Sequence, residues 1–151
     1  MTARPLTDDE VGLARTMFGA AIDYARVKII QRKWAFFQPR DTVMAPTGNI
    51  HFHPAGCRYC ADFAQADRDA QGLFLHEMTH VWQYQSGIFL PFRRLPFARY
   101  GYDLVPGKPF DRYGIEQQAE IVRHAFLSRR GVRLDGKPPI ASYEALLPFG
   151  R

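Results

Sequence analysis

Apolar residues recur at helical spacing in two long segments of the chain. When residues 66–87 are projected at about 100° per residue, apolar side chains gather on one side and polar side chains on the other. The apolar side consists of Phe74, Leu75, Met78, Val81 and Trp82. A second helix is predicted over residues 114–131, where the apolar stripe consists of Ile115, Ala119, Val122 and Phe126. A glycine ends each segment, at Gly87 and Gly131, and favours a helix end there.

The first third of the chain combines a short helix with strand-like runs. Thr7 and Glu10 have the spacing of a capping box, and an apolar stripe follows them as far as Gly19, so we expect a helix between these points. Short runs of β-branched and aromatic residues then alternate with turn residues, which is typical of strands. The predicted strands cover residues 27–30, 34–37, 42–45 and 50–53. Together they predict a small antiparallel sheet just before the helix of residues 66–87.

These elements predict one α+β domain. A chain of 151 residues is long enough for a single hydrophobic core. Segment 88–113 is rich in aromatic residues and proline, so we expect irregular structure there, with a short helix near residues 91–99. The expected divisions are an N-terminal helix and sheet (1–65), two helices (66–87 and 114–131), the irregular segment between them (88–113), and a loose tail (132–151) with a short helix at 141–147.

Composition and charge narrow the range of partners. The net charge is +5, and the lysines and arginines are scattered, so the sequence carries no signature of nucleic-acid binding. A moderately basic surface still permits an acidic partner such as a cell-wall polymer or a membrane surface. No apolar run approaches the roughly 18 residues that a membrane span requires, and the first residues lack the apolar region of a signal peptide. We therefore expect a protein that is cytoplasmic, or exported without a cleaved signal peptide.

The helix of residues 66–87 carries His-Glu-Met-Thr-His at residues 76–80, on its polar side. Residues four apart lie one turn apart on the same face, so His76 and His80 can both reach one metal ion. Zinc is the metal that this pattern indicates, and zinc lowers the pKa of a bound water to about 7. Glu77 lies about 100° further round the helix, where its carboxylate can take the proton of that water as a general base.

Zinc in such a site needs a third protein ligand, and Glu116 and Glu120 are the candidates. They lie four residues apart on one face of the helix of residues 114–131. Two neighbouring carboxylates repel each other, so a nearby cation would account for the pair. One carboxylate can bind the metal, and the other can accept a hydrogen bond from the second ring nitrogen of a ligand histidine. The spacing alone leaves both assignments open.

The sequence H-E-x-x-H at residues 76–80, followed by Glu116-x-x-x-Glu120 on a later helix, resembles the gluzincin metallopeptidases. The resemblance implies a minimal zincin-like fold in which His76, His80 and Glu116 bind Zn²⁺. It also implies that Glu77 acts as general base and then general acid, while Glu120 supports a ligand histidine. The family usually has Asp at the last position, so the longer Glu120 keeps the reverse assignment open. In this family a strand just upstream of the metal helix lies antiparallel to the substrate, which implies that role for residues 50–53.

Longer runs around the two helices carry a second resemblance. The runs are His-Glu-Met-Thr-His-Val-Trp-Gln-Tyr-Gln and Tyr-Gly-Ile-Glu-Gln-Gln-Ala-Glu-Ile-Val. They resemble short bacterial proteins described as Vgr- or Rhs-related, which are linked by name to secretion systems, including type VI secretion. This resemblance implies a bacterial origin and a role beside a secreted toxin or a secretion-system protein.

A peptidase also needs hydrogen-bond donors for the negative oxygen that forms in the transition state. Tyr113, which directly precedes the second predicted helix, is one candidate. His124 is another, because it follows Glu120 by one helical turn and can face the same groove. Tyr102 is the third. No motif marks these residues, so all three stay candidates.

The pair Cys57-x-x-Cys60 is a separate chemical feature. The two cysteines can stay as free thiols, form a disulfide, or bind a structural zinc ion together with His51 and His53. Free thiols are the favoured interpretation, because no thioredoxin-like strand–helix context surrounds the pair.

The sequence as a whole predicts a zinc-dependent metallopeptidase. Its substrate would be a peptide or protein, including a peptide cross-link of the cell wall. The alternative is a non-catalytic zincin-like module whose aromatic segment 88–113 binds a secretion-system or toxin protein. A third possibility is a redox protein that uses Cys57 and Cys60.

Overall fold

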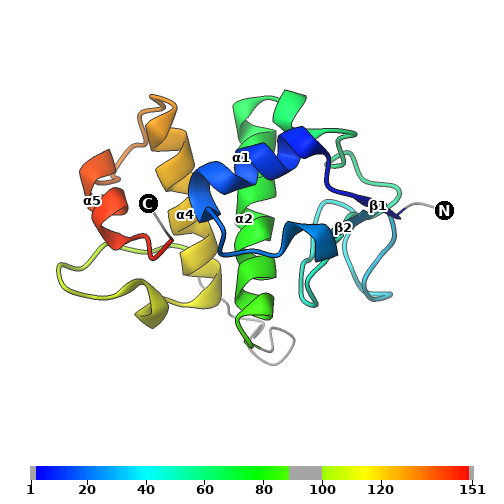
Figure 1. Cartoon of the computed structure of the whole chain (residues 1–151), viewed down its shortest axis with the longest axis horizontal. Coiled ribbons are helices and arrows are strands. Elements are labelled where there is room, and N and C mark those ends of the chain that lie inside the picture. The colour runs from blue at the N-terminus through cyan, green and yellow to red at the C-terminus, as the bar shows by residue number, and fades with distance from the viewer. Residues whose placement is uncertain (1–2, 89–99, 150–151) are drawn as a thin grey trace.

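A long central helix organises the α+β fold (Figure 1). The computed structural model describes residues 3–88 and 100–149. In Figure 1 the central helix α2 (Arg68–Gln85) lies between the strands on one side and helices α4 (Ile115–Arg129) and α5 (Ile140–Leu146) on the other, while α1 (Asp8–Phe18) crosses it. The described residues also form the 3₁₀ helices η1 (Tyr24–Arg26), η2 (Phe63–Gln65) and η3 (Phe110–Arg112). The predicted helix near residues 91–99 lies outside the described residues.

Both long helices that the hydrophobic pattern predicts are present. The side chain of Asp67 caps α2 by accepting a hydrogen bond from the backbone N–H of Ala70. The helix ends before Gly87, whose φ of 96° lies in the left-handed region that favours glycine. Buried residues of the predicted stripes pack α2 and α4 against the core. They are Phe74, Leu75, Met78 and Val81 on α2 and Ala119, Val122 and Phe126 on α4.

The predicted capping box of the first helix is also confirmed. The Thr7 hydroxyl accepts a hydrogen bond from the backbone N–H of Glu10, and the Glu10 carboxylate accepts one from the backbone N–H of Thr7. The same carboxylate is fully buried, where it pairs with both terminal nitrogens of Arg4 and accepts from the backbone N–H of Phe63. Glu10 therefore links the N-terminal strand, α1 and the segment that leads into α2.

The sheet is small and mixed, not antiparallel throughout as predicted. It has the order β1-β2-β3, formed by β1 (Ala3–Pro5), β2 (Lys28–Ile30) and β3 (Ile50–His51). Strands β1 and β2 pair antiparallel, whereas β2 and β3 pair parallel because the long connection between them returns the chain to the same end of the sheet. The sequence pattern did not predict β1, which is only three residues long and ends in proline.

Two of the predicted strands are not strands. Residues 34–37 form bends and a turn, and residues 42–45 contribute a single antiparallel bridge between Met44 and His51. The buried side chain of Gln38 explains the turn. It accepts a hydrogen bond from the backbone N–H of Trp34 and donates to the backbone carbonyls of Thr42 and His51. A side chain that satisfies the backbone in this way competes with strand pairing.

The C-terminal segment is packed and not loose. Tyr143 on α5 is fully buried, and the ring of Phe149 packs edge-on against Phe18 and Trp82. These contacts join the chain end to α1 and α2 in one hydrophobic core. No helix in the part of the chain that the structure describes has both the length and the apolar character needed to cross a lipid bilayer.

Candidate metal centre

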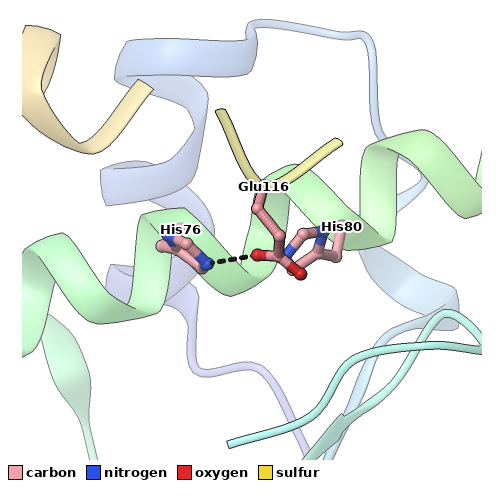
Figure 2. Close-up of side chains that lie close together, drawn as sticks. All are labelled: His76, His80 and Glu116. Carbon is pink, nitrogen blue, oxygen red and sulfur yellow. Dashed lines mark hydrogen bonds and ion pairs between the residues drawn. The ribbon is translucent and has the colours of Figure 1, made fainter. Parts of the chain in front are cut away.

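The side chains of His76, His80 and Glu116 converge between α2 and α4 (Figure 2). One carboxylate oxygen of Glu116, Oε1, lies 3.2 Å from His76 Nε2 and 2.9 Å from His80 Nε2. All three side chains are buried. Within residues 3–88 and 100–149, this is the one group of three potential metal ligands whose donor atoms all lie within 4.8 Å of one another.

The other ring nitrogen of each histidine is held by a second side chain. His76 Nδ1 donates a hydrogen bond to Glu120 Oε2 at 2.8 Å, and His80 Nδ1 donates to Gln83 Oε1 at 2.8 Å. These bonds direct both Nε2 atoms, the nitrogens that a metal would bind, toward Glu116. The structure therefore gives the two glutamates different positions, with Glu116 between the histidines and Glu120 behind one of them.

The role of Gln83 was not predicted from the sequence. Its side chain is fully buried, and its amide nitrogen donates to the Ile115 carbonyl at 3.0 Å and to Gln118 Oε1 at 2.9 Å. Gln83 thus connects His80 to the first turn of α4. A signal for this role was present, because Gln83 lies three residues after His80 on the polar side of the helix, within reach of its ring.

In the absence of a metal, the histidines and the glutamates of this cluster stabilise each other's charged forms. Burial alone would lower the pKa of His76, but the carboxylates of Glu116 and Glu120 outweigh burial and raise the pKa to about 10. Burial alone would raise the pKa of Glu116, but hydrogen bonds with His76 and His80 hold it well below its usual range. The pKa of Glu120 is also lowered, again against the effect of burial. Clustered buried carboxylates of this kind are stable only beside positive charge.

The donor set fits zinc. Zinc binds imidazole nitrogen and carboxylate oxygen at about 2.0–2.2 Å in tetrahedral geometry, which places neighbouring donor atoms about 3.3 Å apart. The separations of 2.9 and 3.2 Å between Glu116 Oε1 and the two Nε2 atoms are close to this value. Two nitrogens and one oxygen would also leave one position open, which is typical of catalytic zinc sites.

A cavity of about 220 Å³ opens beside the three ligand candidates. Glu77 is buried and lines it, together with Glu120 and residues 41–43. Tyr100 and Arg123, which carry no sequence motif, line it as well. The ring of Tyr100 stacks on His76 at 6.0 Å between centroids, and the buried Nε of Arg123 has no hydrogen-bond partner within the described structure.

Three residues that were predicted as oxyanion donors lie outside the lining of this cavity. The Tyr113 hydroxyl accepts a hydrogen bond from the backbone N–H of Val105. The Tyr102 hydroxyl lies 2.6 Å from His124 Nδ1 and 2.7 Å from the Tyr143 hydroxyl. His124 Nε2 lies 4.0 Å from Glu120 Oε1, and His76 bonds the other oxygen of the same carboxylate.

The cysteines match the favoured interpretation as free thiols, and the alternative zinc site with His51 and His53 is not assembled. Cys57 and Cys60 are free thiols, and burial raises the pKa of Cys60. His51 faces inward with its Nδ1 at 3.2 Å from the Arg32 carbonyl, whereas His53 Nδ1 accepts from the backbone N–H of Ala55.

The predicted role of residues 50–53 as the strand beside the substrate is not supported. Strand β3 is already paired on both edges, with β2 in parallel on one side and through the bridge to Met44 on the other. Residues 41–43, and not residues 50–53, form the wall beside the candidate metal ligands.

The fold and the site define a small α+β domain with a candidate metal centre between two helices. No protein-family model matches this chain. The chain is 40% identical over 134 residues to the type VI secretion system spike protein VgrG2b of Pseudomonas aeruginosa, a match that covers 83% of this chain and 13% of that protein. The chain thus spans only a small part of this curated relative.

A solved structure shows which domain of that relative the chain resembles. The effector domain of Pseudomonas aeruginosa VgrG2b superposes on this chain with a TM-score of 0.81 and 37% identity, covering 94% of this chain and 80% of that chain. The chain therefore belongs to the family of the VgrG2b effector domain. The predicted Vgr-related resemblance is confirmed, and the gluzincin resemblance stays a prediction.

Proposed function

We propose that this protein is a gluzincin-type, zinc-dependent metallopeptidase that serves as an effector associated with a type VI secretion spike protein. The observation that carries the enzymatic part is the convergence of His76 Nε2 and His80 Nε2 on one oxygen of Glu116. The relation to a spike protein and to its effector domain supports the secretion part. The substrate class is a peptide bond, in a protein or in a peptide cross-link of the cell wall.

In this proposal His76, His80 and Glu116 hold the zinc ion. Bound zinc would polarise the scissile carbonyl and lower the pKa of the attacking water. Glu77 lines the same cavity from the same helix, so its carboxylate is available to take the proton from water and later to give it to the leaving amine.

Glu120 and Gln83 have a supporting role in this proposal. Each accepts a hydrogen bond from the Nδ1 of a different ligand histidine, so the orientation of both rings is set before a metal arrives. The substrate chain would approach along residues 41–43, which form the wall of the cavity next to His76 and His80.

The experiment that tests the metal site is zinc content by elemental mass spectrometry after zinc replenishment. We expect about one zinc per chain in wild type, loss of zinc in Glu116→Gln, and a 10- to 100-fold weaker affinity in Glu120→Gln. Glu144→Gln, which removes a glutamate on α5 paired with Arg129, is the matched control and should bind as wild type does. Zinc-free, well-folded wild type would overturn the proposal, and loss of zinc in Glu120→Gln with retention in Glu116→Gln would reverse the two assignments.

The experiment that tests catalysis is cleavage of a mixed fluorogenic peptide library by wild type and Glu77→Gln. We expect Glu77→Gln to keep its zinc and its fold and to lose cleavage by at least about 100-fold, because the general base is removed. The non-catalytic alternative predicts that Glu77→Gln behaves as wild type in every assay.

One observation relates to that alternative. Segment 104–113, which belongs to its aromatic stretch, lines a separate apolar cavity of about 790 Å³ against α5.

A further inference from the structure

The loop of residues 32–40, which connects β2 toward β3, exposes two adjacent phenylalanines. The side chains of Phe36 and Phe37 are 88% and 60% exposed. Their rings pack edge-to-face against each other, 5.5 Å apart between centroids. In Figure 1 this loop belongs to the sheet side of the molecule, away from α5. Neighbouring exposed aromatic residues of this size usually mark an interaction surface.

The loop has a defined shape, so the exposure is built into the fold. The buried side chain of Gln38 bonds the backbone of Trp34 at one end and of Thr42 at the other. A turn closed by the hydrogen bond from Gln38 N–H to the Ala35 carbonyl holds both phenylalanines at the tip. Fixing the tip in advance lowers the entropy cost of binding, because the loop does not have to order at that moment.

Basic side chains surround the aromatic tip. Arg32, Lys33 and Arg40 are all exposed, and the Lys33 ammonium group donates a hydrogen bond to the Phe36 carbonyl at 3.3 Å. Within residues 32–40 there is no acidic residue, and the first one is Asp41, where the chain enters the wall of the candidate active site. The tip therefore combines apolar rings with a local charge of +3 from three named side chains.

We propose that the loop of residues 32–40 is a docking site for an anionic lipid surface. Peripheral proteins bind such membranes by combining two features: aromatic rings that enter the interfacial region of the bilayer and cations at the level of the headgroups. At their observed exposure the two rings offer about 300 Å² of apolar surface. Each partner in a stable protein–protein interface buries about 800 Å², so a protruding tip of this size fits a lipid surface better than a protein partner.

The position of the loop gives the docking a consequence. Residues 41–43 follow it directly and line the cavity next to His76 and His80. A protein held by Phe36 and Phe37 would have this wall, and therefore the entrance to the candidate active site, close to the lipid surface. The docking itself does not require the metal, so it can be tested whether or not the proposed function holds.

The test is co-sedimentation of the full chain with vesicles of phosphatidylcholine alone or with about one-third phosphatidylglycerol. We expect wild type to bind the anionic vesicles at least about tenfold more tightly than the neutral ones, and Phe36→Ser with Phe37→Ser to lower binding at least about tenfold. Removing two charges with Arg32→Gln and Arg40→Gln should lower binding to anionic vesicles by about 30-fold. Raising the salt from about 0.1 M to about 1 M should also weaken the binding of wild type to the anionic vesicles.

Matched controls distinguish binding through this loop from non-specific binding to vesicles. Val105→Ser removes a half-exposed apolar side chain elsewhere, and Arg112→Gln with Arg133→Gln removes the same charge from other exposed positions. Both controls should bind within about twofold of wild type. Because the side chains of Phe36 and Phe37 are mostly exposed, the serine variants should unfold thermally as wild type does. Wild type that stays in solution with anionic vesicles, or controls that lose as much binding as the loop variants, would overturn the proposal.

Discussion

Replacing Gln83 by leucine tests how the centre is held in place. Gln83 is fully buried at the end of α2, and it makes three hydrogen bonds, to His80, to the Ile115 carbonyl and to Gln118. Leucine has nearly the same volume, so Gln83→Leu removes the hydrogen bonds without opening a large cavity. The expected effect therefore comes from polar groups that lose their partners.

The magnitude follows from these contacts. A net hydrogen bond contributes about 0.5–1.5 kcal/mol, so three of them amount to about 3 kcal/mol. The apolar atoms of a buried leucine return about 1 kcal/mol, which leaves an expected loss of about 2 kcal/mol in the free energy of unfolding. The zinc affinity should fall separately, by about 10- to 100-fold, because His80 Nδ1 no longer has an acceptor that fixes its ring.

Two assays and one matched variant separate these effects. Urea unfolding of the metal-free protein gives the stability, and competition with a chelator gives the zinc affinity. Gln83→Glu keeps the acceptor for His80 Nδ1 but loses the two donated bonds and adds a buried charge, so it should lose stability while keeping zinc affinity within about threefold. Gln83→Leu that binds zinc as tightly as wild type would refute the argument that this side chain positions His80.

Two further predictions concern stability away from the centre. Glu10→Gln should lower the free energy of unfolding in urea by about 3 kcal/mol, because it leaves the Arg4 guanidinium without its buried carboxylate, whereas the exposed Asp8→Asn should change it by less than about 0.5 kcal/mol. Burial lowers the pKa of His51 below its usual 6.5, so the stability that depends on neutral His51 is fully present above pH 6.5 and is lost as the pH falls through the folded-state pKa. Urea titrations at several pH values should therefore show a weaker loss of stability below pH 6.5 in His51→Gln, and an unchanged slope would contradict this reasoning.

The helices could be predicted because their signals are local. The apolar stripes of residues 66–87 and 114–131 and the capping pair of Thr7 and Glu10 each depend on residues within one or two turns. The ligand candidates His76 and His80 share this property, since their spacing on one helix brings them together whatever the rest of the fold does.

The sheet could not be predicted in the same way. Strand pairing joins residues far apart in sequence, and β3 is too short to show an alternating pattern. Runs such as residues 34–37 have strand-forming composition, but the side chain of Gln38 satisfies the backbone there and turns the chain outward. Phe36 and Phe37 therefore lie exposed on a loop, although their apolar character had predicted a strand packed on the core.

The assignment of Glu116 and Glu120 depends on how α4 lies along α2, which spacing on one helix cannot give. In the structure the two helices contact each other at successive turns in antiparallel order. The contacts run from Gln83 with Ile115, through His80 with Glu116 and His76 with Glu120, to Gly72 with Arg123.

Packing fixes this register at both ends. At Gly72 a Cβ atom would meet the Arg123 side chain at 3.2 Å, so glycine permits the close approach there, and at the other end Gln83 bonds the first turn of α4. A shift of α4 by one turn, about 5.4 Å, would bring Glu120 between the histidines in place of Glu116. The same shift would break the bonds of Gln83 and move Arg123 away from Gly72. Which glutamate lies between the two histidines is therefore a property of the helix pair, set by residues outside the group of candidate ligands.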